Sequence, residues 1–151
     1  MSVDYIISVC AKDFQKLHAD DELRRRVASH GYPFDNVIVV RNTMAGELPS
    51  DVFSAATIEV CTDDHPHILT EFGIPEHDEA AEHYTHGPDG HHYWKKHVVN
   101  HLVGLKVSTA GWIVFSDSDC RMLRTPSRSW IEAGMSKMAV DGSILIVAPN
   151  D

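Results

Sequence analysis

The chain has 151 residues, of which 43% are hydrophobic, enough for a domain with a buried core. Thirteen Lys and Arg against 22 Asp and Glu give a formal net charge of −9, which argues against binding to nucleic acid or to an anionic membrane surface. No apolar run approaches the roughly 18 residues of a membrane span, and the N-terminus lacks the pattern of a signal peptide. We therefore expect one cytoplasmic domain, residues 1–151, without a membrane span.

The first third of the chain predicts a β-α-β unit. Apolar, β-branched runs at 5–10 and 36–40 predict two buried strands. Between them, the acidic residues 20–22 predict the start of a helix, and Gly31 predicts its end. Such a unit is expected to be right-handed.

The middle of the chain is less regular. Residues 43–54 predict a loop, and residues 56–61 predict a third, shorter strand. Proline and glycine interrupt residues 65–92, so we expect a long loop that is mobile without ligand and borders the binding cleft.

Two amphipathic helices are predicted in the last third. The first spans 93–108, and its apolar stripe is predicted to comprise Trp94, Val98, Leu102 and Leu105. The second is predicted to have Thr125 as its N-cap and Pro126 as its first residue, with an apolar face formed by Ile131, Met135 and Met138. A final apolar run at 143–148 predicts a last strand.

The segment 111–120, Gly-Trp-Ile-Val-Phe-Ser-Asp-Ser-Asp-Cys, is the most informative part of the sequence. Its four consecutive large apolar residues predict a central parallel strand at 112–117, buried on both faces. At the carboxyl end, where open α/β sheets bind ligands, Asp117 and Asp119 are expected on the same side, roughly 6 to 7 Å apart. Two carboxylates this close favour a compensating cation, and their oxygen atoms suit Mn²⁺ or Mg²⁺. The alternative is that Ser118 or Asp119 starts a turn or caps a helix.

Histidine and cysteine offer weaker signals. Nine of the eleven histidines lie between His65 and His101, and His97 and His101 share one helix face, but no further spacing completes a zinc site. Histidines with a pH-sensitive charge are the simpler interpretation. Each of the three cysteines, at positions 10, 61 and 120, falls at the end of a predicted strand without metal-binding spacing, so we expect reduced thiols.

The order of the predicted elements, together with segment 111–120, resembles the nucleotide-binding half of A-type glycosyltransferases, the nucleotide-diphospho-sugar transferases. The resemblance covers nearly the whole chain. It implies a three-layer α/β/α sandwich with a mostly parallel, Rossmann-like sheet. It also implies a metal-dependent glycosyltransferase that uses a nucleotide-diphosphate sugar and an acceptor that the sequence does not identify.

The same resemblance implies roles for individual residues. Asp117 would contact the ribose or the metal, and Asp119 would ligate a Mn²⁺ or Mg²⁺ ion bound to the diphosphate. Lys96 and Asn100, one helical turn apart, would reach the diphosphate. The implied nucleotide-sugar site comprises Cys10, Ala11, Arg41, Asp63, Lys96, Asn100 and Asp117, and the implied metal site comprises Asp117 and Asp119. No catalytic residue is assigned.

The sequence departs from this family in two places. Arg41-Asn42 stands where family members often have an acid that contacts the base. The chain also stops at Asp151, before the family's acceptor-binding half, so it is expected to be truncated after the nucleotide-binding half. The missing groups would come from the His-rich segment 65–101, from a second subunit of a homo-oligomer, or not at all.

Two other functions stay open. The first is a non-catalytic or degenerate module of the same fold that binds a nucleotide or nucleotide sugar without transferring it. The second is a nucleotidyltransferase, which would need a Gly-rich loop after the first strand.

Overall fold

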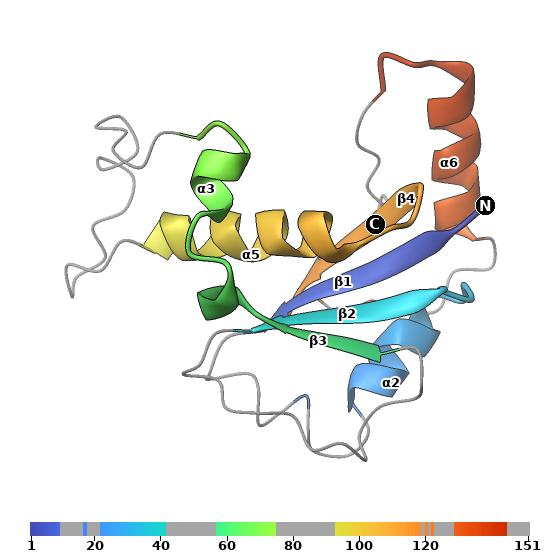
Figure 1. The fold of residues 1–151 in the computed structure, drawn as a ribbon. Helices are drawn as coiled ribbons and strands as arrows, with labels where there is room; N and C mark the ends of the chain where they lie inside the picture. The colour runs from blue at the N-terminus through green and yellow to red at the C-terminus, as the bar shows by residue number, and fades with distance from the viewer. Residues whose placement is uncertain are drawn as a thin grey trace.

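Four strands form one parallel sheet. The computed structural model describes residues 1–9, 17, 22–41, 57–74, 93–118, 120, 122 and 129–144, with the backbone alone for 93–97. The strands are β1 (Val3–Val9), β2 (Asn36–Arg41), β3 (Thr57–Cys61) and β4 (Trp112–Asp117). They pair in the order β3-β2-β1-β4, and every pair is parallel (Figure 1). The predicted strands at 5–10, 36–40, 56–61 and 112–117 are therefore confirmed to within two residues.

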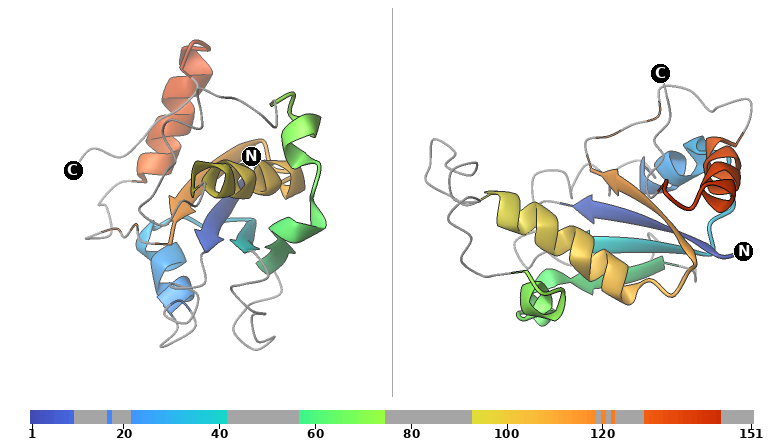
Figure 2. Two further views of the ribbon diagram at one scale, coloured as in Figure 1. Left: turned by 90° about the vertical axis from the view of Figure 1, so that its left-hand side faces the viewer. Right: turned by 90° about the horizontal axis from the view of Figure 1, so that it is seen from above.

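Helices cover both faces of this sheet. Helix α2 (Glu22–Ser29) lies on one face and α5 (Tyr93–Val107) on the other, so the described part of the chain is an α/β fold with helix, sheet and helix layers (Figure 2). Helix α6 (Trp130–Val140) contributes Ile131 to the apolar cluster on the α2 side. A short 3-10 helix, η3 (Thr62–Asp64), and α3 (Ile68–Glu71) follow β3. No helix in the described ranges has both the length and the hydropathy needed to cross a membrane.

The sheet separates two apolar cores, because successive side chains of a strand point to opposite faces. The α2-side core contains Val3, Tyr5, Ile7, Val9, Leu17, Leu23, Val39, Val114 and Ile131. The α5-side core contains Ile6, Ile38, Val40, Ile68, Leu102 and Val103. All seven residues of β1 are buried, so β1 is the strand around which the described sheet is organised.

The prediction that strand 112–117 is central is wrong for the part of the chain that the structure describes. There β4 is an edge strand, and Phe115 is 38% exposed. Trp112 packs against the α2-side core and Ile113 against the α5-side core, which explains the continuous apolar run. Such a run shows that both faces contact helices, but it cannot show which strands lie alongside.

The apolar stripe predicted for α5 is partly wrong. Leu102 is buried as expected, but Leu105 is 40% exposed and Val103 is fully buried. The buried face is rotated because the helix meets β1 at Gly104, where an added Cβ would lie 2.6 Å from Ile6 Cγ2. A glycine at the contact allows this close approach, which a hydrophobic period cannot reveal.

Of the other predicted helix boundaries, the end of α2 is confirmed and the start of α6 is not. Helix α2 ends before Gly31 as expected, with a left-handed φ of 63° at that glycine. Helix α6 begins later than predicted, with Ser129 as its N-cap, whose side chain accepts a hydrogen bond from the Glu132 amide at 3.2 Å. This Ser-x-x-Glu pattern is itself a start signal that was overlooked. The predicted N-cap Thr125 and Pro126 lie outside the described residues.

Several predicted segments are described only in part. Within 65–92, helix α3 was not predicted, and residues 75–92 lie outside the described residues. The predicted loop at 43–54 also lies outside them. Of the predicted last strand at 143–148, Ser143 and Ile144 are not in a strand, and the remainder lies outside the described residues.

Candidate functional site

The strand order creates a switch point between β1 and β4. From β1 the chain passes through α2 to β2 on one side, whereas β4, which α5 precedes, pairs with β1 on the other side. The helices that follow these two strands, α2 after β1 and α6 after β4, both contribute to the α2-side core, so the switch lies in the strand order alone. Open α/β sheets bind ligands in the crevice at this point, outside the carboxyl ends of the strands. Here the paired residues at that edge are Ser8 and Asp117.

Four polar side chains gather at this edge on the α5 face, and we call them the switch-point cluster: Ser8, Asn100, His101 and Asp117. The Asn100 Nδ2 donates a hydrogen bond to the Ser8 Oγ at 2.6 Å, which ties α5 to β1. The His101 Nε2 lies 3.8 Å from the Asp117 Oδ1, and the imidazole packs against the edge of Phe115 with ring centroids 5.0 Å apart. The side chains of His101 and Asp117 are 37% and 47% exposed, so a ligand can reach both.

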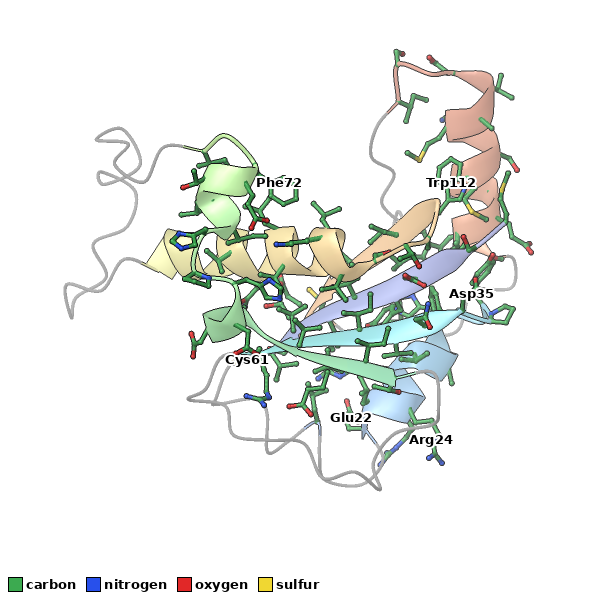
Figure 3. The ribbon with its side chains drawn as sticks, viewed as in Figure 1. Glu22, Arg24, Asp35, Cys61, Phe72 and Trp112 are labelled. Atoms are coloured by element: carbon green, nitrogen blue, oxygen red, sulfur yellow. The ribbon has the colours of Figure 1, made fainter. Side chains whose placement is uncertain are left out.

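A buried arginine supports the same edge from the opposite face. Arg26 of α2 donates from Nε to the Glu22 Oε1 at 3.1 Å. One terminal nitrogen, Nη1, donates to two backbone carbonyls after β4, those of Ser118 and Cys120, the latter at 3.2 Å. The Cys120 amide in turn donates to the Asp117 carbonyl at 3.1 Å. The backbone that follows the acidic end of β4 is therefore bonded to α2; Figure 3 labels Glu22 on that helix.

Tyr5 lies next to this arginine in the α2-side core. Burial raises the pKa of its phenol, although a hydrogen bond with Ser116 and the positive charge of Arg26 act in the lowering direction. The phenol is therefore a neutral group at physiological pH. Tyr5 therefore forms a hydrogen bond with Ser116 near the acidic end of β4 without adding a negative charge there.

Of the predicted nucleotide-sugar residues, Asn100 and Asp117 are brought together. Arg41 is not with them: its side chain lies on the α2 face and forms an ion pair with Glu59 of β3. Asp63 is exposed in η3, beyond the end of β3, which is the strand furthest from β4 (Figure 3 labels its neighbour Cys61). Arg41 is therefore separated from the cluster by the sheet itself, and Asp63 by the strand order.

The remaining predicted residues cannot be placed. Lys96 lies on α5 one turn before Asn100, but its side chain is outside the described residues. Cys10 and Ala11, which follow β1, and Asp119, which follows Ser118, also lie outside them. The predicted pair Asp117 and Asp119 is thus seen through Asp117 alone.

Sequence reasoning missed three residues of this edge. Ser8 interrupts the apolar run of β1 near its end, which is a signal that a polar partner is present. His101 was grouped with His97 rather than with Asp117, because the strand pairing that brings β4 beside β1 is not visible in the sequence. Arg26 was hidden within the run Arg24-Arg25-Arg26, although its spacing of three from buried Leu23 places it near the core.

The donor atoms of the cluster fit a divalent cation in part. Asp117 offers a carboxylate oxygen and His101 an imidazole nitrogen, a combination that Mn²⁺ accepts more readily than Mg²⁺ does. Within the described residues, no group of three or more metal-ligating side chains converges. A further ligand would have to come from Asp119 or from the bound nucleotide itself.

Comparison with family models, with curated proteins and with solved structures gives no match. The function is therefore argued from the residues and the geometry of this chain.

Proposed function

We propose that this protein binds a nucleotide-diphosphate sugar together with a divalent cation and transfers the sugar to an acceptor, as a metal-dependent glycosyltransferase. The observation that supports this most is the switch-point cluster. Side chains from β1, β4 and α5 meet at the carboxyl edge where the strand order reverses, and one of them is an accessible carboxylate at the end of a strand.

Each residue of the cluster has a role in this proposal. Asp117 ligates the cation with Asp119, and His101 adds a nitrogen ligand or a hydrogen bond to the diphosphate. Asn100 Nδ2 already donates to Ser8, so its amide is held in a fixed orientation at the edge of the site. Lys96, one turn earlier on α5, supplies a positive charge for the phosphates. Cys10 and Ala11 follow β1 directly and would line the nucleoside.

A bound cation would stabilise the negative charge that develops on the leaving diphosphate. The protein's own groups hold and orient the donor. The −9 net charge of the chain makes this local arrangement necessary, because an anionic diphosphate is repelled by the molecule as a whole.

One feature favours a second candidate, a module that binds the nucleotide sugar without transferring it. In the switch-point cluster only Asp117 and His101 have acid–base side chains, and both are assigned to the cation or the diphosphate. No described side chain of the cluster is then left to act as a general base. Donor hydrolysis or transfer with Mn²⁺ supports the enzyme, and donor binding without turnover supports the module.

The carboxylate of Asp117 tests the proposal directly. Saturating Mn²⁺ and a nucleoside diphosphate at a hundred times their Kd should stabilise the wild type by about 2.7 kcal/mol, which raises the Tm of a domain of this size by roughly 5 to 11 °C. Asp117→Asn should abolish most of this shift, because the amide is a poor cation ligand. Its own Tm should change little, since the side chain is half exposed.

Glu132→Gln is the matched control. It removes the same charge from an exposed position on α6 and should keep the full ligand-induced shift. Thermal melts with Mn²⁺, with Mg²⁺, and with each ion plus uridine, guanosine or adenosine diphosphate make the comparison, and Asp119→Asn extends it. A wild type whose Tm does not respond to any of these combinations would contradict the proposal.

A further inference from the structure

We infer that Arg26 is a positioning residue for the metal-binding segment after β4, a role that rests on the proposed function. Its guanidinium bonds to the carbonyls of Ser118 and Cys120, the two neighbours of Asp119 in the sequence. The arginine would contact neither the cation nor the nucleotide. It would act on the site through the carbonyls on either side of position 119.

The burial of Arg26 is the first reason for this inference. The residue is only 7% exposed, and a buried charge is costly unless it is paired and hydrogen-bonded. Its partners are the Glu22 carboxylate, 3.1 Å from Nε, and the two carbonyls after β4. An arginine that only solubilised the surface would be exposed, whereas this one is buried and links α2 to residues 118 and 120.

The geometry of the two carbonyls is the second reason. They belong to residues 118 and 120, and both accept a hydrogen bond from Nη1. The Cys120 amide in turn donates to the Asp117 carbonyl at 3.1 Å. The residues before and after the predicted ligand Asp119 are thus both anchored. Removing a group that does not touch the metal but orients one of its ligands typically lowers metal affinity by about 10-fold to 100-fold.

Replacing Arg26 with lysine separates the effect of its positive charge from the effect of its hydrogen-bonding geometry. A lysine at position 26 would keep the positive charge beneath the acidic segment, but it lacks the planar fork that bonds Glu22 and the carbonyls together. If Arg26 only reduces the repulsion between carboxylates, lysine should replace it. If Arg26 fixes the backbone, lysine should not.

The experiment uses the full chain with Arg26→Met, Arg26→Lys and the matched control Arg25→Met, which removes an exposed arginine from the adjacent position of α2. The affinity for Mn²⁺ is measured by electron paramagnetic resonance at a temperature at which each variant is folded by near-ultraviolet circular dichroism. Hydrogen exchange of the peptide that contains Cys120 is measured without metal.

We expect Arg26→Met to weaken Mn²⁺ binding by about tenfold or more. It should also raise exchange at the Cys120 peptide at least several-fold while β1 and β2 stay protected. Arg26→Lys should show both effects in weaker form, and Arg25→Met neither. If Arg26→Met does not fold, the lysine variant decides, because it keeps the charge and most of the volume.

Three outcomes would overturn the inference. They are unchanged exchange at the Cys120 peptide, wild-type Mn²⁺ affinity in a folded Arg26→Met variant, and full replacement by lysine. The second result would make Arg26 purely structural. A wild type that binds no Mn²⁺ overturns the proposed function itself, and that failure is seen before any variant is compared.

Discussion

At the scale of single residues, His30 is a buried titratable group surrounded by aromatic rings. It is 7% exposed and lies among the rings of Tyr5, Phe34 and Trp130, with centroids 5.2, 6.0 and 5.9 Å away. Its Nδ1 is buried and has no hydrogen-bond partner among the described residues. Burial lowers the pKa of this imidazole, because the charged form loses its hydration.

Stability should therefore fall on the acid side of neutrality. Below the unfolded pKa of about 6.5 the unfolded chain binds a proton that folded His30 does not, so the free energy of unfolding decreases as pH falls. This decrease is at most about 1.4 kcal/mol per pH unit for one group, and it stops once the pH is below the lowered folded pKa.

Urea unfolding between pH 8 and pH 5 measures this effect. His30→Phe keeps an aromatic ring in the cluster and should flatten the pH dependence, whereas exposed His67→Gln should leave it as in the wild type. The assignment to His30 would be wrong if the two variants had the same pH profile.

Single residues also show how far the sequence predicts the site. Asp117 was found because an acid at the end of an apolar strand is a local pattern. The buried acid Asp4 was not: it accepts hydrogen bonds from Asn36 Nδ2 at 2.9 Å and Ser108 Oγ at 2.7 Å. Its partners are 32 and 104 residues away in the sequence. Asp4 stabilises the amino edge of the sheet, opposite the candidate site.

At the scale of elements, the contact between α5 and β1 depends on Gly104. In an open helix position Gly→Ala should stabilise by up to about 1 kcal/mol, because alanine has the higher helix propensity. At Gly104 the new Cβ would lie 2.6 Å from Ile6 Cγ2 and 3.4 Å from Phe115 Cε1. We expect Gly104→Ala to destabilise by about 1 to 3 kcal/mol instead, the usual cost of overpacking.

The matched control for this contact is Gly111→Ala, where an added Cβ meets nothing within 4 Å. Chemical denaturation of both variants measures the difference. Since Asn100 lies one turn from Gly104, the Gly104→Ala variant should also lose affinity for nucleotide if α5 is pushed away from Ser8. A stabilised Gly104→Ala variant would show that α5 is packed less closely than the structure indicates.

The elements themselves were largely predictable, but their faces were not. Local patterns predict β1 to β4, α2 and α5 because β-branched runs and a 3.6-residue period are properties of short segments. The exposure of Leu105 and the burial of Val103 depend on how α5 crosses the sheet. The start of α6 was predicted at Thr125 and is found at Ser129, where the Ser-x-x-Glu pattern was the better local signal.

At the scale of the whole molecule, the strand order decides what the site contains. The alternation of strands and helices predicts a parallel α/β fold. It does not say on which side of β1 the strand β4 pairs, and this pairing places Asp117 beside Ser8. The cluster is therefore a product of topology, which explains why the sequence predicted two of its four members, Asn100 and Asp117.

The two apolar cores share one sheet, which makes a prediction about cooperativity. Side chains of β1 alternate between the α2-side core and the α5-side core, so neither core can be lost while the sheet persists. The chain should then unfold in one transition, as single domains of this size usually do. This tests the expectation that residues 1–151 form one domain.

Val103→Ala provides the perturbation, because Val103 is fully buried in the α5-side core. It should lower the free energy of unfolding by about 2 kcal/mol and the Tm by roughly 4 to 8 °C.

The reporters are on the opposite face: Trp112 and Trp130 pack against the α2-side core. In a background with Trp94→Phe, the substitution should lower the Tm seen by tryptophan fluorescence and the Tm seen by far-ultraviolet circular dichroism by the same number of degrees. Leu105→Ala, at an exposed position of α5, should change the Tm little. If the circular dichroism transition moved while the tryptophan transition did not, the two faces would unfold independently, and the single-domain prediction would be wrong.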